Sequence, residues 1–67
     1  MRGGELIREA RRRTGLSQKQ LAERLGTTQS VITRWETGQR SPTFEALVRA
    51  VRACGLDVAI SLVAADP

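Results

Sequence analysis

Residues 17–38 read SQKQLAERLGTTQSVITRWETG, and this stretch decides the fold. Ser17 stands at the N-cap position of a helix, and Gln20 follows three residues later, which is the spacing of a capping box. Gly26 is placed to end that helix, because glycine adopts the left-handed conformation without steric cost. The stretch therefore predicts a short helix over residues 18–25.

A second short helix follows at once. Thr28 can cap it, and we expect it to run over residues 29–37. Only Gly26 and two threonines separate the two helices, which is too short a connection for them to run antiparallel. The helices must therefore cross steeply, as in a helix-turn-helix.

At about 100 degrees per residue, this second helix divides its side chains into two arcs. Val31, Ile32 and Trp35 gather on one side and predict a buried face. The opposite arc carries an amide, three hydroxyls and a guanidinium, namely Gln29, Ser30, Thr33, Arg34 and Thr37. Such groups can hydrogen-bond to base edges in the major groove of DNA. A polar arc is also what an ordinary solvated helix presents.

From about Leu6 to Cys54 the chain resembles the helix-turn-helix domain of the Cro and phage-repressor type, the XRE family. The matching residues occur in order and at the right spacing: Gly15-Leu16-Ser17-Gln18, Leu21-Ala22, Leu25-Gly26, Thr28-Gln29, Ile32, Trp35-Glu36, Gly38 and Pro42. Members of this family fold as four or five packed helices and bind operator DNA as a two-fold dimer. The resemblance implies a mainly all-α domain over residues 4–54, with residues 29–37 as the recognition helix in the major groove.

The resemblance also assigns roles to individual residues. It implies base contacts for Gln29, Ser30 and Arg34, with Thr33 beside them. In the family, an arginine at the position of Arg11 pairs with the glutamate that matches Glu36, so we expect a structural ion pair here.

The loop after the recognition helix lies along the sugar-phosphate backbone in related proteins. Arg40, with nearby backbone amides, could hold a phosphate there and set the angle of the recognition helix. The alternative is a mobile surface loop with an incidental arginine. The expected phosphate contacts are Gln18, Thr28, Thr37 and Arg40.

Two more helices flank the motif. Leu6, Ile7 and Ala10 recur at helical spacing and predict a first helix from about Gly4 to Thr14. A fourth helix, capped by Thr43, is expected up to Cys54 and has apolar residues three and four apart. We expect this stripe to lie in the core: Phe44, Leu47, Val48 and Val51.

Residues 55–63 change to a period of two, which predicts a strand where many relatives have a fifth helix. The alternating apolar residues are Leu56, Val58, Ile60 and Leu62. A lone strand leaves its backbone groups unpaired, so we expect it to pair with the same segment of a second subunit or to dock a partner protein. The alternative is an extended tail that covers the helices. Residues 64–67 form a terminal tail.

Composition limits the function classes. The chain of 67 residues has 11 Lys and Arg against 7 Asp and Glu, a net charge of +4 that suits a polyanionic partner. It has no His and a single Cys54, so we expect no metal site, no disulfide within the chain and no cofactor. No constellation of catalytic residues is evident, so an enzyme is not expected. The absence of an apolar membrane span and of a signal peptide predicts a cytoplasmic protein without membrane contact.

These observations predict a sequence-specific transcriptional regulator, expected to be a repressor, that binds an inverted-repeat operator in double-stranded DNA as a homodimer. The alternative is an antitoxin, or a subunit of another complex. In that case the C-terminal strand would dock a toxin or other protein, and operator binding would serve autoregulation.

Overall fold

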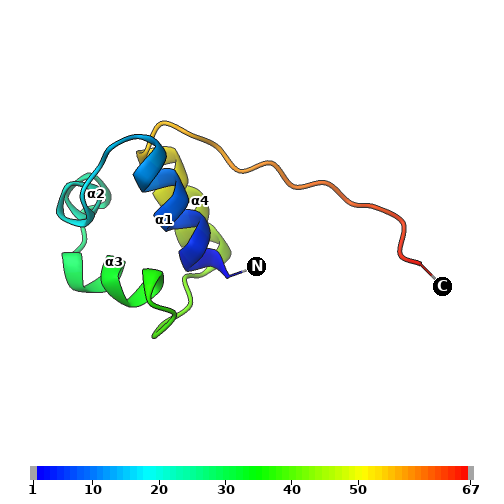
Figure 1. The fold of residues 1–67 in the computed structure, drawn as a ribbon, viewed down its shortest axis with the longest axis horizontal. Coiled ribbons are helices and arrows are strands. Elements are labelled where there is room, and N and C mark those ends of the chain that lie inside the picture. Colours follow the sequence, from blue (N-terminus) through cyan, green and yellow to red (C-terminus); the bar gives the residue numbers. More distant parts are fainter. Residues whose placement is uncertain (1, 67) are drawn as a thin grey trace.

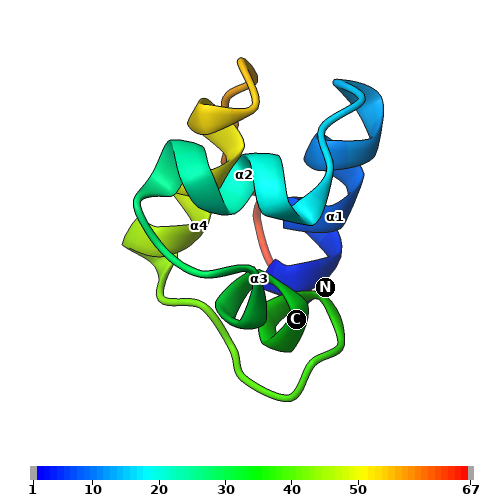
Figure 2. The ribbon, with the colours of Figure 1, turned by 90° about the vertical axis from the view of Figure 1, so that its left-hand side faces the viewer.

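The computed structural model describes residues 2–66, which form four α-helices and no β-strand. The helices are α1 (Gly3–Arg13), α2 (Gln18–Leu25), α3 (Gln29–Glu36) and α4 (Phe44–Ala53). Helices α1 and α4 lie side by side, and α2 and α3 pack against this pair (Figures 1 and 2). The predicted all-α class is confirmed, and each helix begins and ends within one residue of its predicted limits.

Capping side chains set the limits of α2 and α3. The hydroxyl oxygen of Ser17 accepts a hydrogen bond from the N–H of Gln20 at 3.0 Å, and the Gln20 side chain accepts one from the N–H of Ser17 at 2.8 Å. Gly26 then ends α2 in the left-handed conformation, with a φ of 68°. Thr28 caps α3 by accepting from the N–H of Val31 at 3.4 Å. Each helix is thereby confined to 8 residues.

The core is built from aliphatic side chains. The largest fully buried residues are Ile7 of α1, Leu21 of α2 and Ile32 of α3. Smaller residues complete it, namely Ala10, Ala22, Ala50, Val51 and Cys54. All four helices contribute to this cluster, so Ile32 anchors α3 to the rest of the domain from behind.

The expectation that Phe44 lies in the core is wrong, because its side chain is 61% exposed. Phe44 is the first residue of α4. Side chains of a helix lean toward its N-terminus, so a residue at the first position points past the end of the packed face. Further along the same helix, Ala50 is fully buried.

Residues 56–66 have no regular secondary structure, so the predicted strand is absent from the part of the chain that the structure describes. The segment leaves the end of α4 and runs away from the helices (Figure 1). Leu56 and Val58 are half-buried against the core, whereas Ile60 is 66% and Leu62 is 98% exposed. A strand forms only where its backbone is paired, and no second strand lies within residues 2–66 to pair with it. The alternative, an extended tail that covers the helices, holds only for the residues up to Val58.

Candidate nucleic-acid interface

Helix α3 presents a polar surface on the side opposite its buried Ile32. Gln29, Ser30 and Arg34 are exposed along this surface. The Arg34 guanidinium forms no ion pair with any residue of the range 2–66. An amide, a hydroxyl and a guanidinium are therefore available to an external partner, on a helix whose opposite side is anchored in the core by Ile32.

Gln18, the first residue of α2, links that helix to α3. Its Oε1 accepts hydrogen bonds from the Thr33 hydroxyl at 2.9 Å and from Gln29 Nε2 at 3.5 Å. Its Nε2 donates to Glu36 Oε1 at 3.3 Å. The side chain belongs to the packing between the two helices, and one of its two amide hydrogens is left for an outside acceptor.

The hydroxyls of Thr33 and Thr37, both expected on the polar surface of α3, already donate hydrogen bonds within the protein. The half-buried Thr33 donates to Gln18 Oε1 and, at 3.0 Å, to the carbonyl oxygen of Gln29. The Thr37 hydroxyl donates to the carbonyl oxygen of Thr33 at 2.9 Å, and Thr37 is the C-cap of α3. Because a hydroxyl has one hydrogen, both groups can offer only an acceptor to a further partner. On the polar surface of α3, the side-chain donors that remain are those of Gln29, Ser30 and Arg34.

Arg11 and Glu36 form an ion pair between α1 and the end of α3. Arg11 donates from Nε and Nη2 to the two carboxylate oxygens, each at 2.8 Å, and from Nη1 to the carbonyl oxygen of Leu16 at 3.1 Å. The Glu36 side chain is 3% exposed and that of Arg11 is 16% exposed. The hydrogen bonds to Glu36 raise the pKa of Arg11 above its ordinary value. Arg8, which the sequence did not single out, approaches the same carboxylate at 4.0 Å.

The backbone of α1 packs directly on the C-terminal end of α3. A Cβ on Gly4 would overlap the carbonyl oxygen of Trp35, and one on Gly3 would lie 3.0 Å from Cγ of Pro42. Sequence reasoning missed this contact. The available signal was a pair of glycines in the first turn of a helix, where glycine is otherwise unfavourable.

The chain turns sharply after α3 and returns along its last turn. Gly38 has a φ of 78°, and its N–H donates to the carbonyl oxygen of Trp35 at 3.2 Å. The N–H of Arg40 donates to the carbonyl oxygen of Arg34 at 3.1 Å. The exposed side chain of Arg40 has no ion-pair partner among residues 2–66. Arg34 and Arg40 thus lie at the same end of α3.

Comparison with known proteins shows where this architecture belongs. A family model described as helix-turn-helix matches residues 7–60. The chain belongs to the XRE-type helix-turn-helix family. An uncharacterized HTH-type transcriptional regulator from Methanothermobacter thermautotrophicus is 46% identical over 50 residues, which cover 75% of this chain and 72% of that protein. No solved structure gave a significant match.

Membership of the XRE-type family makes the protein a DNA-binding transcription regulator. Along residues 2–66, this XRE-type domain has no helix of the length and apolarity that crossing a membrane requires. The same residues contain no group of three or more His, Cys, Asp or Glu side chains arranged to hold a metal ion.

Proposed function

We propose that this XRE-type protein is a repressor that binds an inverted-repeat operator as a two-fold homodimer. The observation that carries the proposal is the outward display of Gln29, Ser30 and Arg34 on a helix fixed from behind by Ile32 and Glu36. A reading helix must hold its polar groups at a fixed angle to the groove, and an anchored helix of this kind meets that requirement.

Two of these residues have side chains suited to particular bases. Gln29 can bond to an adenine through both atoms of its amide, and Arg34 can donate two hydrogen bonds to a guanine. Ser30 can serve as donor or acceptor to either purine. Thr33 takes a supporting part, because its hydroxyl is bonded to Gln18, which also accepts from Gln29. Its own base contact would be through the methyl group or the hydroxyl oxygen.

The phosphate contacts of the proposal lie at the start of α2 and at both ends of α3. Gln18 and Thr28 stand at the starts of α2 and α3, and each keeps one hydrogen without a partner in residues 2–66. Thr37 and Arg40 stand at the C-terminal end of α3. Arg40 can donate to a phosphate at once, whereas the Thr37 hydroxyl must first give up its bond to the carbonyl oxygen of Thr33. Neutralising phosphates releases counterions, so the affinity should fall steeply as salt is added.

The homodimer of the proposal forms through residues 56–63. Ile60 and Leu62 are exposed in the single chain, and in a paired strand residues two apart would face the same side. Pairing this segment with its copy would satisfy the free backbone groups and cover both apolar side chains. A chain of this size buries only about 60% of its unfolded surface on its own, which favours such an association. The same segment could add to a sheet edge of a partner protein, as the antitoxin alternative requires.

Selection of bound duplexes from a random DNA pool tests the proposed function. We expect an enriched inverted repeat whose half-sites are about 34 Å, or one helical turn, apart. An enriched single half-site would contradict dimeric binding. Retention of all duplexes alike would contradict sequence-specific recognition.

A further inference from the structure

Arg2 reaches from the start of α1 to the turn that follows α3. Its backbone is extended, and its carbonyl oxygen accepts a hydrogen bond from the N–H of Glu5 at 3.1 Å, which makes it the N-cap residue of α1. Its Nη1 lies only 3.1 Å from the position that a Cβ on Gly38 would occupy. The guanidinium therefore rests on the turn at the place where glycine leaves room for it.

The position of Arg2 is fixed by the close packing of α1 on α3. Gly4 lies against the carbonyl oxygen of Trp35, and Gly3 lies against Pro42. These contacts are made by backbone and ring atoms, so they bring the start of α1 directly against the end of α3. Figures 1 and 2 show the N-terminal end of α1 beside the C-terminal end of α3.

Three arginines stand around the C-terminal end of α3: Arg2 against Gly38, Arg34 near the end of the helix, and Arg40 in the following turn. Arg2, Arg34 and Arg40 are exposed, and none of them forms an ion pair with another residue in the range 2–66. The acidic residue at this end of the helix, Glu36, is buried and paired with Arg11. Exposed guanidinium groups without an ion pair, placed around the end of an exposed polar helix, are suited to the phosphates that flank a groove.

We propose that Arg2 binds the DNA phosphate backbone together with Arg40, on the strand that passes the C-terminal end of α3. This inference rests on the proposed function and adds a contact from outside the helix-turn-helix. Arg2 fixes the register of α3 on the duplex and reads no base, because phosphate contacts position a protein without specifying sequence. The competing role is purely structural: a cation near the C-terminus of a helix interacts favourably with the helix dipole, so Arg2 would only stabilise α3.

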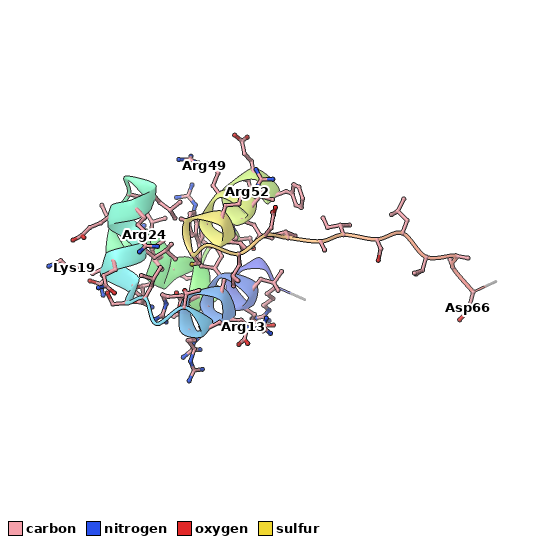
Figure 3. The ribbon with its side chains drawn as sticks, turned by 90° about the horizontal axis from the view of Figure 1, so that it is seen from above. Arg13, Lys19, Arg24, Arg49, Arg52 and Asp66 are labelled. Carbon is pink, nitrogen blue, oxygen red and sulfur yellow. The ribbon has the colours of Figure 1, made fainter. Side chains whose placement is uncertain are left out.

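The test compares the wild-type protein with Arg2→Ala, Arg2→Lys and the control Arg49→Ala. Arg49 is also exposed and has no ion pair in the described part of the chain, and Figure 3 shows it projecting from the α4 side of the molecule. Fluorescence anisotropy measures the affinity for the selected operator and for an unrelated duplex at several salt concentrations. Thermal denaturation of each variant reports stability.

We expect Arg2→Ala to weaken binding to both duplexes by the same factor and to lower the slope of log affinity against log salt by about 0.9, as loss of one phosphate contact requires. Arg2→Lys should keep the slope, and Arg49→Ala should match the wild type. The inference is overturned if Arg2→Ala keeps the wild-type slope of log affinity against log salt, whether or not its melting temperature falls. It is also overturned if Arg49→Ala loses as much affinity as Arg2→Ala. In either case operator binding by the wild type leaves the proposed function standing. Failure of the wild type to bind either duplex overturns both.

Discussion

Each helix of the domain packs against two others, whereas the segment beyond Val58 is exposed along the whole of its described length. The two regions contain similar apolar side chains: Ile32 of α3 is fully buried, while Ile60 is exposed. The difference lies in what surrounds them. The helices provide one another with apolar faces, and the C-terminal segment has no complementary surface within residues 2–66. Periodicity therefore indicates a local conformation, but only a partner surface converts it into stable structure.

Removing the buried carboxylate should have the largest effect on the domain. In Glu36→Ala the guanidinium of Arg11 loses both of its charged hydrogen bonds and stays largely buried. Breaking one side of a buried pair costs about 3–5 kcal/mol. We expect chemical denaturation to show a loss of unfolding free energy of this size.

The matched control for that variant is Arg12→Ala, which removes an exposed charge of the same helix α1. Its effect should stay within about 0.5 kcal/mol. A Glu36→Ala protein as stable as Arg12→Ala would show that the pair does not hold α1 to α3.

Mutations in the C-terminal segment should have the opposite effect: the dimer should be lost while the helical domain stays folded. Ile60→Glu combined with Leu62→Glu places two charges on the side that we expect at the dimer contact. Both residues are exposed in the single chain, so the melting temperature of the monomer should not change. Light scattering on a sizing column should show a dimer for the wild type and a monomer for this variant.

The control for the dimer is Ala59→Glu with Ser61→Glu, which puts the same charges on the alternate side of the segment. This variant should remain dimeric. Dimers in both variants would place the subunit contact elsewhere. A monomeric wild type that captures a separate protein through Ile60 and Leu62 would favour the antitoxin alternative.

A third change leaves the helical domain and the C-terminal segment intact and tests the polar surface of α3. Arg34→Ala removes an exposed guanidinium that has no ion pair in residues 2–66. If Arg34 donates to a guanine, discrimination at one base pair should fall by about 1–3 kcal/mol. Competition binding with operators changed at single positions measures this. A loss spread evenly over all sequences would make Arg34 a phosphate contact.

The smallest effect is expected where the two regions join. Asp57 accepts hydrogen bonds from the N–H of Val58 at 2.8 Å and from Nε of Arg52 at 3.2 Å, and these bonds lower the pKa of Asp57 below its ordinary value of 3.8. A lowered pKa stabilises the folded form above the ordinary value, and this contribution is lost as the pH falls through the folded pKa. NMR titration of the carboxylate should give a midpoint below 3.8. A midpoint at or above that value would mean that the segment leaves Asp57 free.

The helices could be predicted from sequence because their signals are local. The Ser17 and Gln20 capping box, the left-handed Gly26 and the Thr28 cap each act within a few residues, and the structure contains all three. The strand could not be settled in the same way. Its formation depends on a second backbone, and an alternating pattern does not say where that backbone comes from.

The candidate site was predictable in its outline and less so in its internal bonds. The helical wheel of α3 separated the exposed Gln29 and Arg34 from the buried Ile32. It could not show that the hydroxyl of Thr33 is held by Gln18 across the helix pair, because that bond depends on the crossing of two helices. The approach of Arg2 to Gly38 depends on three-dimensional packing in the same way.

The attachment of α3 through Ile32 and Glu36 has a consequence for engineering. The residues that anchor this helix are buried, and positions 29, 30 and 34 face outward, with one long hydrogen bond from Gln29 to Gln18 as the bond that an exchange would remove. We therefore expect these positions to accept other residues without loss of the fold. A library randomised at those three positions should yield folded proteins with new preferences for operator sequence. The same helical scaffold would then supply a set of proteins that each bind a different short DNA half-site.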